Sequence, residues 1–174
     1  NEVRYPAAHA AATFAAARAD DFHLTAHAGE WAGPASVRQA LGIGAERIGH
    51  AVSAAKDSSL LEEISARGIH LELCPTSNVR TGALPSLEAH PAGKYFERGL
   101  SVSLNTDDPA FFGTDLNGEY LRVARAFGFS RAEMVELARN AFEAAFLGPA
   151  ERDMLLCRFD SATNEPPDAG RTQT

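Results

Sequence analysis

The sequence contains only two cysteines, and no part of it approaches the run of about eighteen apolar residues that a membrane-spanning helix needs. Cys74 and Cys157 lie far apart and form no C-x-x-C pair. A disulfide between them stays open, but two thiols in a chain of this size are typical of the reducing cytoplasm, where we expect the protein. The alanine-rich stretch 7–19 lacks the basic start and compact apolar block of a signal peptide.

Positive charge is also scarce. Lys and Arg number 16 against 23 Asp and Glu, which gives a formal net charge of -7 and a pI near 5.3. This balance argues against binding to a nucleic-acid backbone or to an anionic membrane. The 174 residues are 45% hydrophobic and 22% charged, which is the composition of one globular domain. The chain starts at Asn1 without Met and without a recognisable element, so we expect residues to be missing upstream.

Hydrophobic periodicity, turn residues and helix-breaking positions divide the chain into alternating helices and strands. The expected strands are 22–26, 47–50, 69–74 and 100–105. The expected helices are 7–19, 34–41, 58–67, 90–98, 115–127, 131–146 and 149–158. Residues 161–174, rich in Pro, Asp, Gly and Thr, are expected to form a flexible tail after the domain 1–160.

The order of helix then strand, repeated four times, favours a parallel sheet. Each strand is followed by a polar cluster, HAGE, GHA, CPTSN or NTDDP, as in an α/β barrel whose chemistry gathers at the carboxyl ends of its strands. No G-x-G-x-x-G follows a strand, which argues against an open dinucleotide-binding sheet. A complete barrel needs eight strands and roughly 250 residues. We therefore predict an α/β fold with about four parallel strands that is half of a (β/α)8 TIM-type barrel, followed by C-terminal helices.

Five candidate site residues follow three of these strands: His27, Glu30, His50, Asp107 and Asp108. Each has a structural alternative, since a lone His at a strand end is commonly a hydrogen-bonded packing residue and acidic residues suit the start of a helix. Their recurrence at one rim favours chemistry instead. His nitrogen and Asp oxygen are ordinary Zn²⁺ ligands, zinc lowers the pKa of water toward ~7, and a carboxyl that does not bind metal can move protons.

The motifs HAGE, RIGHA, CPTSN and SLNTDDP, in this order and at this separation, resemble those of the adenosine deaminase family of metal-dependent amidohydrolases. The resemblance implies that the chain is the C-terminal half of a (β/α)8 TIM-type barrel with one Zn²⁺ per site, for which His27 and Asp107 are ligands. It implies that Glu30 delivers a proton to the purine N1. It also implies that His50 orients and polarises the attacking water, and that Asp108 hydrogen-bonds the purine N7.

The resemblance covers roughly residues 1–120 and leaves part of the family pattern unmatched. The family has an H-x-H pair at the end of the first strand, which supplies two further zinc ligands, and this sequence contains no H-x-H. We therefore expect the missing N-terminal half of the barrel to be the partner that completes the site. The 174 residues alone are expected to be inactive, because two ligands hold zinc far more weakly than four.

The implied activity is hydrolytic deamination of adenosine or 2′-deoxyadenosine to the inosine-type product and ammonia. The expected partner is thus a small-molecule purine nucleoside, not a nucleic acid or a membrane. Two other substrates stay open, 6-aminodeoxyfutalosine of menaquinone synthesis and free adenine. A non-enzymatic alternative is an inactive half-barrel fragment or a purine-binding module, which the absence of two ligands favours.

Four further histidines lie away from the strand ends and are expected to be structural or solvent-facing: His9, His23, His70 and His90. Ser77 and Asn78 are expected to support the loop after the third strand. Phe111 and Phe112 could line the pocket, and for Trp31 a place in the pocket wall and packing under the next loop are equal alternatives.

Overall fold

The computed structural model describes residues 2–164, and the fold is built on a four-stranded parallel sheet. The strands are β1 (Thr25–Ala28), β2 (Arg47–His50), β3 (His70–Leu73) and β4 (Val102–Leu104). They lie side by side in chain order, and all three pairings are parallel. The expected parallel sheet is therefore confirmed, and the carboxyl ends of its strands lie at one edge.

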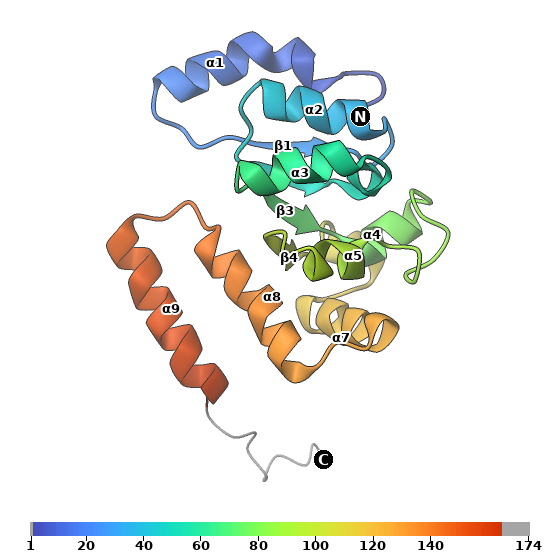
Figure 1. The fold of residues 1–174 in the computed structure, drawn as a ribbon, viewed down its shortest axis with the longest axis vertical. Helices are drawn as coiled ribbons and strands as arrows, with labels where there is room; N and C mark the ends of the chain where they lie inside the picture. Colours follow the sequence, from blue (N-terminus) through green and yellow to red (C-terminus); the bar gives the residue numbers. More distant parts are fainter. Residues whose placement is uncertain (1, 165–174) are drawn as a thin grey trace.

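Helices occupy most of the remaining chain. The α-helices are α1 (Ala11–Ala19), α2 (Pro34–Gly42), α3 (Ser58–Ala66), α4 (Pro75–Arg80), α5 (Ala92–Glu97), α6 (Pro109–Phe112), α7 (Leu116–Phe127), α8 (Arg131–Glu143) and α9 (Pro149–Asn164). Two 3-10 helices, η1 (Ala7–Ala10) and η2 (Val52–Lys56), precede α1 and α3. Figure 1 shows α1, α2 and α3 together at the β1 end of the sheet, with α7, α8 and α9 at the β4 end.

The sheet has one apolar face and one polar face because side chains alternate along each strand. Ala26, Ile48, Leu71 and Val102 belong to one buried cluster that joins the apolar face of the strands to the helices. The helices contribute larger side chains to this cluster: Val37, Leu41, Leu60, Leu61, Ile64, Tyr95 and Leu137. Each fully buried aliphatic side chain stabilises the fold by roughly 1.5–3 kcal/mol, so this cluster fixes the sheet against its helices.

Local sequence signals set several helix boundaries. The Asp57 carboxylate caps α3 by accepting a hydrogen bond from the backbone nitrogen of Leu60 at 3.0 Å. Ser130 and Glu133 form a capping box at the start of α8. Gly128 ends α7 in the left-handed conformation, with φ of 69°.

Several elements differ from the sequence prediction: α8 ends at Glu143 instead of residue 146, and α6 and η2 were not expected. β1 begins at Thr25 instead of residue 22, and Phe22 is 66% exposed, so the packing of the later strand residues outweighs its β propensity. The PTSN stretch, expected as a loop, begins helix α4 with Pro75 at its first turn. α9 continues through Asn164, so the first four residues of the expected tail are helical, and 165–174 lie outside the described residues.

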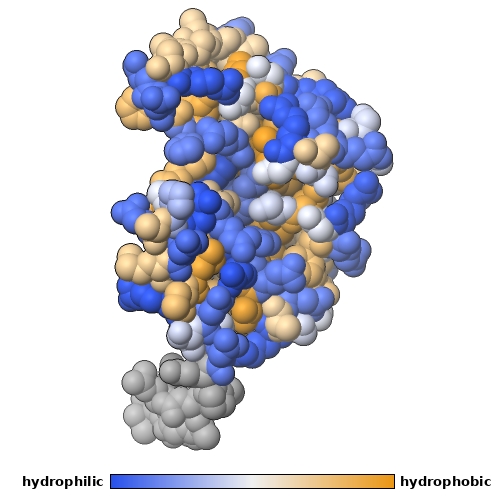
Figure 2. Space-filling model, turned by 60° about the vertical axis from the view of Figure 1, so that its left-hand side comes forward, coloured by the Kyte–Doolittle hydropathy of each residue, from blue (hydrophilic) through white to orange (hydrophobic). Residues whose placement is uncertain are grey.

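The surface of the described chain mixes polar and apolar side chains. Figure 2 shows hydrophilic and hydrophobic residues intermingled over the face that it presents. Between residues 2 and 164, no helix combines the length and the apolar character needed to cross a membrane.

Candidate functional site

His27 lies in β1 on the polar face of the sheet, where its side chain is exposed. It pairs in the sheet register with Gly49 of β2. A Cβ atom at residue 49 would come within 3.0 Å of the His27 ring carbon Cδ2, so a glycine there makes room for the imidazole. The ring also makes an edge-to-face contact with His50, with ring centroids 5.0 Å apart and planes at 80°.

Glu30 is brought over the strand end by a turn at Gly29, whose φ of +77° favours glycine. The Glu30 side chain is 19% exposed. Its Oε1 accepts hydrogen bonds from Nδ2 of Asn78 at 3.2 Å and from Oγ1 of Thr81 at 3.3 Å. Its Oε2 lies 3.9 Å from Nε2 of His50. The carboxylate of Glu30 and the imidazole of His50 therefore face each other.

A second carboxylate, from the start of the chain, anchors the loop that carries Glu30. Glu2 accepts backbone hydrogen bonds from Gly29 at 2.7 Å, from Ala32 at 2.9 Å and from Trp31. Burial works to raise the pKa of Glu2, but these hydrogen bonds outweigh it and lower the pKa. Glu2, Glu30 and Trp31 line one cavity of about 450 Å³, to which His27 also contributes.

His50 ends β2 and is 2% exposed. Its φ is +68° and that of Ala51 is +49°, so two successive residues adopt the left-handed conformation that side chains disfavour. The hydroxyl of Tyr95 holds this turn by donating to the Ala51 carbonyl at 2.7 Å. Burial lowers the pKa of His50, and the nearby charge of Glu30 offsets only part of that effect, so the neutral imidazole is favoured near pH 7.

Asp107 follows β4 and is exposed, with a left-handed φ of +58°. Its Oδ2 accepts a hydrogen bond from Oγ of Ser77 at 2.7 Å, which leaves Oδ1 free of that contact. Asp107, His27 and His50 line one cavity of about 420 Å³. Asp108 takes the N-cap position of α6, is exposed, and does not contribute to the wall of that cavity within residues 2–164.

Four of the five predicted residues thus come together, and Asp108 stays at the rim. His27 and Asp107 offer a ring nitrogen and a carboxylate oxygen to the same cavity, and these donor types suit Zn²⁺. A catalytic zinc site has three protein ligands. In the part of the chain that the structure describes, no group of three or more His, Cys, Asp or Glu residues could hold a metal ion. The donor atoms of His27 and Asp107 are of the kinds that bind zinc. The described residues supply at least one ligand fewer than a catalytic zinc site has.

Helix α4 supports the site with one of its sides. Ser77 holds Asp107, while Asn78 and Thr81 hold Glu30. Asn78 also contacts Nδ1 of His50 at 3.1 Å. Because residues three and four positions apart share one side of a helix, a single short element reaches three of the candidate residues.

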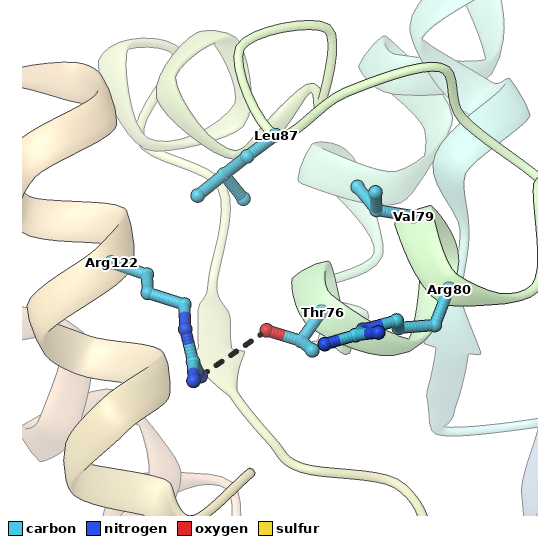
Figure 3. A pocket seen from close by; sticks show the side chains of 5 residues that line it. All are labelled: Thr76, Val79, Arg80, Leu87 and Arg122. Carbon is cyan, nitrogen blue, oxygen red and sulfur yellow. Dashed lines mark hydrogen bonds between the residues drawn. The ribbon is translucent and has the colours of Figure 1, made fainter. Parts of the chain in front are cut away.

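The other side of α4 packs toward α7 (Figure 3). A separate cavity of about 180 Å³ lies there, and Figure 3 shows its lining: Thr76, Val79, Arg80, Leu87 and Arg122. Glu119 of α7 is fully buried and accepts the backbone N–H of Thr76 at 3.0 Å, which places a carboxylate at the N-terminus of α4. The same carboxylate pairs with Arg122 at 3.2 Å, so α7 fixes where α4 sits.

Other predicted residues have mixed outcomes. Phe111 is 84% exposed and lies against Phe112, and neither residue contributes to the cavities around His27. His70 and His90 are buried with hydrogen-bonded rings, as expected of structural histidines. The contacts of Glu2 and Thr81 with the site had no sequence signal, because they depend on how distant segments pack.

The parallel sheet, with histidines and carboxylates gathered at its carboxyl edge, is characteristic of the active-site end of an α/β barrel. A sequence model of the adenosine deaminase family matches residues 1–162, and the chain belongs to this family. The chain is 42% identical over 151 residues to the aminodeoxyfutalosine deaminase of Streptomyces coelicolor, covering 86% of this chain and 39% of that protein. It is also 42% identical over 159 residues to an adenosine deaminase of Klebsiella pneumoniae, covering 91% and 48%.

Solved structures agree with the family assignment. An adenine deaminase from Arthrobacter aurescens superimposes with a TM-score of 0.90 at 29% sequence identity, covering 95% of this chain and 51% of that one. The chain therefore spans about half the length of the relatives that it matches. The predicted fold, the C-terminal half of an amidohydrolase barrel, is confirmed.

Proposed function

We propose that this chain supplies catalytic residues for zinc-dependent hydrolytic deamination of a purine 6-amino group, with adenosine or 2′-deoxyadenosine as the substrate. The observation that carries the proposal is the pairing of Glu30 with His50, 3.9 Å apart, beside His27 and Asp107. Oxygen from water bonds to C6 of the purine, the bond from C6 to the amino nitrogen breaks, and ammonia leaves with the inosine-type product.

His27 and Asp107 would hold Zn²⁺, which supplies a Lewis acid that lets a water molecule lose its proton near neutral pH. Ser77 would orient the Asp107 carboxylate through its hydrogen bond of 2.7 Å. Partners of this kind fix the direction of a metal ligand and strengthen binding.

Glu30 would give its proton to the purine N1 as the C6–O bond forms. Its Oε1 is held by Asn78 and Thr81, so the carboxyl has a fixed direction at the edge of the cavity. His50 would orient the attacking water and stabilise the oxygen as it gains charge. Buried at 2% exposure, its ring is held rigidly enough for that role. Asp108, at the rim, would contact the purine N7.

The choice of substrate rests on the relatives. Similarity to an adenosine deaminase and to an aminodeoxyfutalosine deaminase is equal in percentage identity, and one solved relative is an adenine deaminase. All three are named as deaminases, which favours the reaction class over any one substrate. Adenosine is the default, and 6-aminodeoxyfutalosine and adenine are the alternatives.

We further propose that residues supplied by another half-barrel complete the site. The described residues offer two candidate zinc ligands, and the relatives are about twice as long as this chain. On this basis the 174 residues alone would bind zinc weakly and be inactive. A purified 174-residue chain with full zinc content and normal turnover would contradict this part of the proposal.

The test uses the complete gene product that carries this sequence, assayed for zinc content and for ammonia release from adenosine, 6-aminodeoxyfutalosine and adenine. The Glu30→Gln variant should keep its zinc and lose about 10²- to 10⁴-fold in turnover, because it cannot donate the proton. Glu63→Gln is the matched control, since Glu63 lies in α3 and its carboxylate pairs with Arg38 and Arg67 at the surface. Near-normal turnover by Glu30→Gln would remove Glu30 as the donor.

The non-enzymatic alternative predicts a different result. A purine-binding module would bind adenosine without releasing ammonia and without zinc. That outcome for the wild-type gene product would reject the deaminase proposal as a whole.

A further inference from the structure

Three buried polar side chains form a hydrogen-bonded chain that leads from the backbone of α5 to the candidate site. His90, Asn78 and His50 are 3%, 0% and 2% exposed. The contacts along this chain are between 3.1 and 3.3 Å long. Because buried polar groups must be paired as donor and acceptor, the direction of each hydrogen bond in the chain can be worked out from its fixed end.

The fixed end is the backbone N–H of Ala92, which can only donate. It lies 3.1 Å from Nδ1 of His90, so that nitrogen must be the acceptor and carries no proton. Burial lowers the pKa of His90 to about 3, and the ring is therefore neutral near pH 7. A neutral imidazole has one N–H. The proton of His90 is consequently on Nε2.

The next contact orients the amide of Asn78. Nε2 of His90 donates to Oδ1 of Asn78 at 3.3 Å, so the NH₂ group of that amide points the other way. There it meets Nδ1 of His50 at 3.1 Å and Oε1 of Glu30 at 3.2 Å. The two hydrogens of Nδ2 are both used, one for each neighbour.

The last contact assigns the proton of His50. Nδ2 of Asn78 can only donate, so Nδ1 of His50 accepts and carries no proton. The proton of the neutral ring is then on Nε2, the nitrogen that lies 3.9 Å from Oε2 of Glu30. We propose that His90 is a positioning residue that acts through Asn78 to fix His50 in the Nε2–H tautomer.

Glu30 alone could not keep the Asn78 amide in this direction throughout a reaction. Its ionised carboxylate favours the NH₂ group, but a Glu30 that donates a proton must first be protonated, and its O–H could then donate to Oδ1 of a reversed amide. His90 cannot reverse in the same way, because its Nδ1 faces a backbone N–H. It is therefore the constant anchor of the chain.

The fixed tautomer decides what His50 can do. With the proton on Nε2, His50 donates a hydrogen bond toward the cavity and suits stabilisation of a negatively charged oxygen. With the proton on Nδ1, it would present a lone pair toward Glu30 instead. The catalytic consequence rests on the proposed function, whereas the tautomer itself can be observed without any turnover.

The test labels the histidines of the complete gene product with ¹⁵N and records which imidazole nitrogens carry a proton, with the His50 signals identified by their loss in His50→Gln. The wild-type protein should show Nε2–H at His50. His90→Leu removes the donor to Asn78, and Glu30→Gln is added for the tautomer measurement so that no carboxylate fixes the amide; a population with Nδ1–H at His50 should then appear. With adenosine, kcat of the single variant His90→Leu should fall by about 10²-fold with little change in KM, since general acid–base groups contribute this much or more.

Two further variants separate positioning from packing. His90→Gln keeps an N–H donor near the position of Nε2 and should restore the Nε2–H tautomer and most of kcat. His70→Leu is the matched control, because His70 is also buried at 5% exposure but lies at the opposite end of its strand. It should lose stability and leave the His50 tautomer unchanged.

If His90→Leu does not fold, Asn78→Asp tests the contact through which His90 acts on His50. A carboxylate at residue 78 can only accept, so His50 should then carry a proton on Nδ1. An unchanged Nε2–H tautomer in the protein that carries both His90→Leu and Glu30→Gln, or in Asn78→Asp, would overturn the proposal, and so would a fall in kcat of His90→Leu without that tautomer change. A wild-type protein that releases no ammonia would reject the proposed function. The tautomer measurement would still test the hydrogen-bonded chain from His90 to His50.

Discussion

Acid should destabilise this fold through His70, a buried histidine at the start of β3. Its Nδ1 and Nε2 contact the hydroxyls of Ser101 and Ser103 at 2.8 and 2.9 Å, and the residue is 5% exposed. Burial, together with the positive charge of Arg47, lowers its pKa from 6.5 to about 4. The folded state therefore keeps His70 neutral over a range of pH in which the unfolded chain protonates it.

The sign and size of the effect follow from proton linkage. Above pH 6.5 neither state binds the proton, and His70 contributes no pH dependence. Between pH 6.5 and about 4 the unfolded state binds more protons, so the free energy of unfolding falls as the pH falls. At about 1.4 kcal/mol for each pH unit, the loss reaches about 3 kcal/mol when the pH arrives at 4.

Urea unfolding at several pH values between 7.5 and 4 measures this effect when the wild-type protein is compared with His70→Gln. The stability difference between the two proteins should shift by about 3 kcal/mol in favour of the variant over that range. Ser101→Ala is the control, because it weakens the same contact and leaves the imidazole able to titrate. A stability difference between wild type and His70→Gln that stays constant with pH would refute the reasoning.

Two other predictions concern the site and its thiols. Ser77→Ala removes the hydrogen bond to Asp107 and should weaken zinc binding by about 10- to 100-fold, measured by competition with a chelator; unchanged affinity would show that the serine does not orient the ligand. Cys74 is buried and its pKa is raised, first by burial and then by nearby carboxylates, whereas Cys157 is exposed. In the native protein at pH 7.5, iodoacetamide should therefore modify Cys157 well before Cys74, as followed by peptide mass spectrometry, and equal rates would contradict the burial of Cys74.

The sequence predicted the parts of the site that lie at strand ends. His27, His50 and Asp107 could be grouped because parallel strands end at one edge of a sheet, so the order of motifs carries spatial information. The role of Asn78 was predicted only in part. It was expected to support a loop, but it lies in helix α4, and its contacts with both Glu30 and His50 depend on where α7 places that helix.

The hydrogen-bonded chain from His90 through Asn78 to His50 had no sequence signal. His90 lies 40 residues after His50 and away from the strand ends, so the sequence predicts only a structural or solvent-facing histidine. Only packing shows which nitrogen faces a backbone amide. The predicted start of β1 was wrong for a related reason. Local propensity favoured Phe22, but tertiary packing begins the strand three residues later.

Directed evolution of this protein would meet a conflict between stability and activity among the strained backbone positions beside the candidate site. His50, Ala51 and Asp107 all have positive φ, a conformation that costs a residue with a side chain roughly 1–2 kcal/mol. A library screened only for heat resistance should enrich glycine or asparagine at residue 107, where the side chain is exposed, and that replacement would delete a site residue. Ala51→Gly is the exception, because it relaxes the turn after β2 and leaves the side chains of His50 and Asp107 in place.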